Sequence, residues 1–108
     1  MINFVIIKIG YMKTREEYLN DIKQFKKEFA NKFGILSIGI FGSVARNEHQ
    51  AESDLDDFVE LQEPDFFIMS DIQETLEQIC HCKVDLLRLR KNLRPLLLKR
   101  IEQDGIYA

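Results

Sequence analysis

The 108-residue sequence lacks several features that would indicate a membrane, secreted or nucleic-acid-binding protein. No apolar run approaches the roughly 20 residues that a membrane-spanning helix requires. Residues 1–9 are apolar but have neither a basic leader region nor a small-residue cleavage site, so a secretory signal is not expected. The only two cysteines, Cys80 and Cys82, are too close in sequence to form a useful disulfide, which favours a reducing, cytoplasmic setting.

Positive charge is not in excess either. Fifteen Lys and Arg residues stand against eighteen Asp and Glu residues, for a net charge of −3. This balance argues against a protein that binds nucleic acid mainly by neutralising phosphates. A nucleotide ligand remains compatible with it, because a bound magnesium ion would supply positive charge locally.

The length and the pattern of apolar residues predict one α/β domain over residues 13–108. Residues 1–12 form either an N-terminal extension or an additional edge strand. A capping-box pattern at Thr14 to Glu17 begins a predicted helix, and Gly34 ends it. The expected elements after it are a strand over 35–41, a helical turn over 43–47, a strand over 54–61, a helix over 65–80, a strand over 83–89 and a helix from 92–95 to 105.

The most informative motif is Gly42-Ser43, followed after ten residues by Asp54-Leu55-Asp56. Residues i and i+2 of a strand project from the same face, about 7 Å apart. The Asp54 and Asp56 carboxylates could therefore converge on magnesium, which prefers oxygen ligands and is usually held by one or two carboxylates together with substrate phosphates. Asp85, an acid in an otherwise apolar strand, is the candidate for a third carboxylate, since a buried acid is costly unless it is paired or metal-bound.

The Gly42-Ser43 turn has the properties of a phosphate-binding segment. Gly42 would allow the backbone to approach a phosphate closely, and Ser43 adds a hydroxyl donor. A helical turn that begins at Ser43 would direct its free N–H groups towards the same phosphates. Arg46 could supply a positive charge to them, although a surface or salt-bridged arginine is an equally good interpretation.

Together these residues resemble the signature of the minimal nucleotidyltransferase group of the polymerase-β-like superfamily: Gly-Ser, ten residues, Asp-x-Asp. The resemblance implies a small mixed β-sheet of three to four strands flanked by helices. It also implies that Asp54 and Asp56 bind magnesium, that Asp85 is a further ligand or a general base, and that Gly42 and Ser43 hold the triphosphate. The resemblance implies a nucleoside triphosphate as substrate, with ATP as the expected donor, and two magnesium ions as cofactors.

The resemblance further implies a partner. Small stand-alone members of this group commonly pair with a HEPN-domain toxin and act as its antitoxin, transferring AMP from ATP to a tyrosine of the toxin. Two other functions stay open. The chain could transfer a nucleotide to a small-molecule hydroxyl, or it could neutralise a partner by binding alone.

Two residues depart from the family pattern, and three others need to be placed in the fold. Asn47 stands where relatives usually have glycine, and it tolerates the left-handed conformation better than most residues. Asp57 stands where an aliphatic residue is usual, so it should either find a cationic partner or loosen the sheet. His49 is expected to be a solvated loop residue, with a nucleotide contact as the alternative. Phe66 and Phe67 are expected in the core first and at an interface second.

Overall fold

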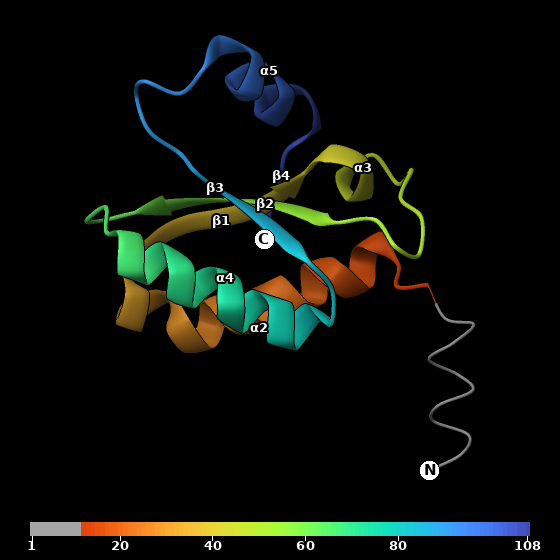
Figure 1. The fold of residues 1–108 in the computed structure, drawn as a ribbon, viewed down its shortest axis with the longest axis horizontal. Coiled ribbons are helices and arrows are strands. Elements are labelled where there is room, and N and C mark those ends of the chain that lie inside the picture. The colour runs from red at the N-terminus through yellow and green to blue at the C-terminus, as the bar shows by residue number, and fades with distance from the viewer. Residues whose placement is uncertain (1–11) are drawn as a thin grey trace.

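The computed structural model describes residues 12–108 as one mixed β-sheet with helices on both sides (Figure 1). The predicted extension or edge strand at residues 1–12 lies, except for Met12, outside the described residues. The elements agree closely with those predicted, with a short final strand, β4, that the sequence did not reveal. In chain order they are α2 (Arg15–Phe33), β1 (Ile35–Phe41), α3 (Gly42–Ala45), β2 (Leu55–Leu61), α4 (Phe66–Cys80), β3 (Val84–Arg88), α5 (Pro95–Asp104) and β4 (Ile106–Tyr107).

The four strands lie in the order β3-β2-β1-β4. β1 pairs antiparallel with both β2 and β4, whereas β2 pairs parallel with β3. The parallel pair is connected by α4, as a parallel connection requires a crossover. The expected fold class, an α/β domain with a small mixed sheet, is confirmed.

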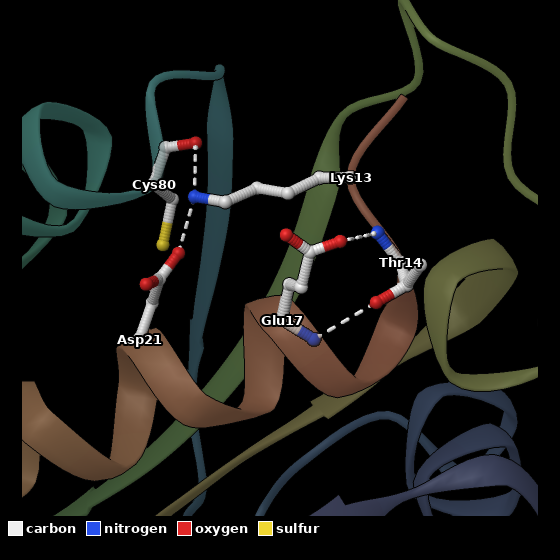
Figure 2. Close-up of polar contacts among 5 residues, drawn as sticks. All are labelled: Lys13, Thr14, Glu17, Asp21 and Cys80. Atoms are coloured by element: carbon white, nitrogen blue, oxygen red, sulfur yellow. Dashed lines mark hydrogen bonds and ion pairs between the residues drawn. The ribbon is translucent and has the colours of Figure 1, made fainter. Parts of the chain in front are cut away.

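The start of α2 is held by side chains that also tie it to the end of α4 (Figure 2). The Thr14 hydroxyl accepts a hydrogen bond from the Glu17 amide at 3.1 Å, and the Glu17 carboxylate accepts one from the Thr14 amide at 3.1 Å. The predicted capping box is therefore confirmed. Lys13 forms an ion pair with Asp21 and donates to the carbonyl oxygen of Cys80 at 3.3 Å, so the two helices are joined where α2 begins.

Each face of the sheet packs against a different core. Figure 1 shows α2 and α4 on one side of the sheet and α5 on the other. The larger core lies under α2 and α4, and the apolar side of α2 belongs to it. A smaller cluster lies under α5 and consists of Phe41, Phe58, Leu93 and Ile101. The larger core includes Tyr18, Ile22, Phe25, Phe33, Ile38, Ile40, Leu55, Val59, Ile72, Leu76 and Val84.

Phe66 and Phe67 lie at the surface and not in the core. The prediction that Phe66 and Phe67 belong to the core is wrong, because their side chains are 80% and 76% exposed at the start of α4. The inward-facing stripe of α4 begins only with Ile68, which packs against the larger core. None of the helices within residues 12–108 is long and apolar enough to cross a membrane.

Asp57 lies fully buried on the face of β2 that packs against α2 and α4. Both of its carboxylate oxygens lack a hydrogen-bond partner among the described residues, and none of the ion pairs there includes it. The expected cationic partner is therefore not found. Burial, and secondarily the charge of Asp56, hold the pKa of Asp57 well above its usual range, so folding favours the protonated form of this carboxyl.

We expect Asp57→Val to stabilise the protein by about 1 to 3 kcal/mol at neutral pH, the scale of burying a polar group without a partner. The folded state holds a proton that the unfolded chain releases above about pH 4. The free energy of unfolding of the wild type should therefore fall as the pH rises above that value, and the variant should lose this part of the decline. Urea denaturation over a pH series measures both effects.

The matched control is Glu63→Gln, which neutralises an exposed carboxylate just after β2. It should change neither the stability nor its pH dependence appreciably. A valine variant that is less stable than the wild type, or that keeps the same pH dependence, would show that Asp57 is not an uncompensated buried acid.

Candidate active site

Gly42 stands where β1 turns into α3, and two features of the backbone require a glycine there. Its φ is +75°, in the left-handed region that residues with a side chain rarely adopt. A Cβ atom at this position would also overlap the carboxylate of Asp56. Close approach to a phosphate was the predicted reason for this glycine; the structure adds that Gly42 makes room for a predicted metal ligand.

The registers of β2 bring the predicted acidic residues together at one end of the sheet. Asp56 is paired with Phe41 on β1, directly before Gly42, and with Asp85 on β3. Asp54 lies two residues before Asp56, at the exposed entry to β2. Thus the turn and the three carboxylates, up to 43 residues apart in sequence, are neighbours in the fold.

One premise for Asp85 was wrong. The sequence suggested a buried acid that would need a partner, but β3 is an edge strand of the described sheet and Asp85 is exposed. Water can therefore solvate this carboxylate, and burial gives no reason for its presence. What remains is its position directly beside Asp56, on the strand face that also carries Leu87 and Leu89 towards the smaller core.

The electrostatics of the site centre on Asp56, which is half-buried. Burial raises the pKa of Asp56, and the negative charges of Asp85 and Asp54 raise it further. The positive charges of Arg46 and Arg100 act in the opposite direction on this pKa. Acidic side chains that repel one another in this way would gain from a bound cation.

The acidic side chains of the site could supply some, but not all, of the ligands of a magnesium ion. Within residues 12–108 no group of three or more His, Cys, Asp or Glu side chains is gathered closely enough to hold a metal ion. The carboxylates of Asp54 and Asp56 nevertheless provide the hard oxygen ligands that magnesium takes, and phosphates of a substrate commonly complete its shell. The residues therefore fit a magnesium site that is completed by a bound triphosphate.

The segment after Gly42 contains two residues that the sequence analysis singled out. Arg46 forms ion pairs with Asp104 at 3.1 Å and with Glu48 at 3.5 Å, so its guanidinium is engaged by carboxylates at the surface. Its role as a phosphate ligand stays a prediction. Asn47 has a φ of +61°, the left-handed conformation that asparagine tolerates. Asparagine can therefore occupy this position, where a glycine is usual, in a left-handed conformation.

His49 is not the solvated loop residue that was expected. It is 8% exposed, its Nε2 lies 2.7 Å from the carbonyl oxygen of Lys13, and its ring meets that of Tyr18 edge-on at 5.9 Å. These contacts fasten the loop between α3 and β2 to the start of α2. The loop leads directly into Asp54, so His49 supports the site without belonging to it.

Arg100 is the residue near the site that the sequence analysis missed. It lies on α5, 44 residues after Asp56, in a segment whose only evident signals were a helix start and a helix end. Only the packing of α5 over the sheet brings its charge close enough to act on Asp56.

A family model and related sequences both identify this chain as similar to nucleotidyltransferases. Residues 23–107 match the family model described as polymerase beta, nucleotidyltransferase. A candidate protein adenylyltransferase of Methanocaldococcus jannaschii is 39% identical over 100 residues, covering 90% of this chain and 100% of the relative. The protein adenylyltransferase MntA of Thermococcus cleftensis is 32% identical over 98 residues, covering 90% of this chain and 98% of the relative.

Solved structures share the fold. A structure described as a candidate minimal nucleotidyltransferase superposes with a TM-score of 0.71 at 26% identity, covering 90% of this chain and 98% of the other. A chain from the complex of a tri-AMPylated Shewanella oneidensis HEPN toxin with its MNT antitoxin superposes with a TM-score of 0.64 at 18% identity, covering 87% of this chain and 71% of the other. At that lower identity the likeness is one of fold alone.

We expect Gly42→Ala to weaken the binding of ATP with magnesium by about tenfold or more, the equivalent of one well-placed interaction. The added Cβ would displace the Asp56 carboxylate. A fluorescent ATP analogue titrated in the presence of magnesium measures the effect.

Gly34→Ala is the matched control, because Gly34 also has a left-handed φ, of +67°, but a Cβ there would meet only the Gln62 side chain at an ordinary 3.6 Å. Both variants should lose about 1 to 2 kcal/mol of stability from backbone strain. Equal affinity of the two variants for ATP would contradict the role assigned to Gly42.

Proposed function

Because this chain belongs to the polymerase β nucleotidyltransferase family, we propose that it transfers AMP from ATP to a tyrosine hydroxyl of a HEPN-domain toxin and thereby neutralises the toxin. The observation that carries the proposal is the position of Asp56, which lies between Gly42 and Asp85. This position joins a phosphate-binding turn to a carboxylate site, and nucleotidyl transfer needs both.

Each residue has a defined task in this proposal. Gly42 and Ser43 hold the triphosphate, with Arg46 as a further ligand once its guanidinium leaves Asp104 or Glu48. Asp54 and Asp56 hold magnesium, and Asp85 is a further ligand or the base that accepts the proton of the attacking hydroxyl. Bound magnesium would supply positive charge at the phosphates and lower the cost of the negative charge that builds up during transfer.

The reaction is an in-line displacement at the α-phosphorus. The acceptor oxygen forms a bond to that phosphorus and loses its proton, while the bond to the bridging oxygen of the β-phosphate breaks. Its electron pair stays with the departing pyrophosphate. The chain contributes mainly by holding donor and acceptor in this alignment, and alignment alone can provide several kcal/mol, up to about 10, of the barrier reduction.

The nature of the relatives supports a protein acceptor. Two of them are described as protein adenylyltransferases, one of these as a candidate, and the complex with the same fold contains an AMPylated HEPN toxin. A tyrosine hydroxyl of such a partner, in the cytoplasm where ATP is plentiful, is the acceptor that we propose.

The two departures from the family pattern are compatible with the proposed site. Asn47 adopts the conformation that glycine would adopt, and Asp57 points to the opposite face of β2, away from Asp54 and Asp56. Neither residue therefore favours neutralisation by binding alone over catalysis.

The test is to incubate the protein with magnesium and α-labelled ATP in an extract of its own host, and to identify each labelled protein by mass spectrometry. We expect AMP on a tyrosine of a HEPN-domain protein. The Asp54→Asn, Asp56→Asn double variant should reduce labelling at least about a hundredfold, the scale of removing a group that stabilises the transition state. Asp71→Asn, which neutralises an exposed acid on α4, should leave labelling unchanged.

Two further arms separate the alternatives. γ-Labelled ATP should label nothing through this protein, because the γ-phosphate leaves with pyrophosphate. Label only on a small molecule would indicate a small-molecule nucleotidyltransferase. If the double variant still neutralised the toxin as well as the wild type does, neutralisation would occur by binding alone.

A further inference from the structure

α5 lies beside the proposed nucleotide site, on the same side of the sheet. Its residue Ile101 is buried in the smaller core with Phe41 and Phe58. Phe41 directly precedes Gly42, and Phe58 follows Asp56 by two residues on the same face of β2. Figure 1 shows α5 across the sheet from α2 and α4. The helix is therefore fixed next to the turn and the carboxylates.

The ion pair between Asp104 and Arg46, at 3.1 Å, also fixes which side of α5 faces the site. Residues four apart lie above one another on a helix, so Arg100 occupies the same side as Asp104, one turn earlier. The effect of its charge on Asp56 agrees with this placement.

The two arginines near the site differ in their partners. Arg46 is engaged by Asp104 and Glu48. Arg100 is exposed and takes part in none of the ion pairs or side-chain hydrogen bonds found in residues 12–108. It is thus a free cation next to an acidic site, with its guanidinium available to a ligand.

A triphosphate at this site would add several negative charges to those of Asp54, Asp56 and Asp85. Magnesium offsets part of this charge near the carboxylates, but the outer phosphates need further donors. Arginine suits that position because its planar guanidinium can donate two parallel hydrogen bonds to phosphate oxygens.

We propose that Arg100 binds the β- and γ-phosphates of the nucleotide and stabilises the pyrophosphate as it leaves. When the bond between the α-phosphorus and the bridging oxygen breaks, the electron pair remains on pyrophosphate, and the N–H groups of Arg100 donate to the oxygens that gain this charge. Arg100 stays protonated throughout. This inference rests on the proposed function of the same site and extends it to α5.

The experiment compares Arg100→Gln and Arg100→Lys with Lys99→Gln, a matched control that removes the same charge from the neighbouring exposed residue. Affinities for ATP, ADP and AMP are measured in the presence of magnesium, together with the rate of transfer from α-labelled ATP. Thermal unfolding of each variant verifies that the fold is intact.

We expect Arg100→Gln to weaken ATP binding about tenfold or more, the scale of one charge-assisted contact. AMP, which lacks the β- and γ-phosphates, should bind with unchanged affinity. Arg100→Lys should keep part of the ATP affinity because it keeps the charge, and Lys99→Gln should resemble the wild type.

Two results would overturn the inference. Equal ATP affinity of Arg100→Gln and Lys99→Gln would show that Arg100 makes no phosphate contact. An equal loss of AMP and ATP affinity would place its effect elsewhere than on the outer phosphates. A wild-type protein that binds no nucleotide would refute the proposed function and this inference together, whereas a wild type that transfers AMP, with variants that do so equally well, would refute the inference alone.

Discussion

Because β2 pairs with β1 on one side and with β3 on the other, the two registers together determine where the Asp56 carboxylate lies. The antiparallel register places it against the Cα of Gly42, and the parallel register places it beside Asp85. A shift of one residue in either pairing would turn Asp56 to the opposite face. Gly42 at the start of α3, Asp85 on β3 and Arg100 on α5 all lie near this carboxylate.

The two faces of β2 carry carboxyl groups in different environments. Towards α5, Asp56 is half-buried and repelled by Asp54 and Asp85, which suits it to a cation and a nucleotide. Towards α2 and α4, Asp57 is buried in the core with no hydrogen-bond partner among the described residues, and burial raises its pKa well above the usual range. Adjacent carboxyl groups thus differ in chemistry because one can reach solvent and a ligand, and the other cannot.

The core between α5 and the sheet is small. Only four buried residues of the described chain form it, whereas the core under α2 and α4 is larger. Ile101 and the Asp104–Arg46 ion pair nevertheless hold α5 in place, and the charge of Arg100 on this helix acts on Asp56. Asp56 is thus influenced by a residue that follows it by 44 positions in the sequence.

Local patterns were sufficient for the helices and for three of the strands, because capping and periodicity are properties of neighbouring residues. Motif spacing likewise singled out Gly42, Asp54 and Asp56, whose roles stay predictions. The two-residue β4 carries no such pattern, since its pairing with β1 depends on where α5 ends. The exposure of Asp85, the burial of His49 and the place of Arg100 were likewise decided only by tertiary packing, which sets what covers a side chain and which charges reach it. The sequence by itself thus determined the family, the elements and the central motif. The tertiary structure decided the registers that assemble the carboxylates and the cations that face them, because both arise from contacts between segments far apart in the chain.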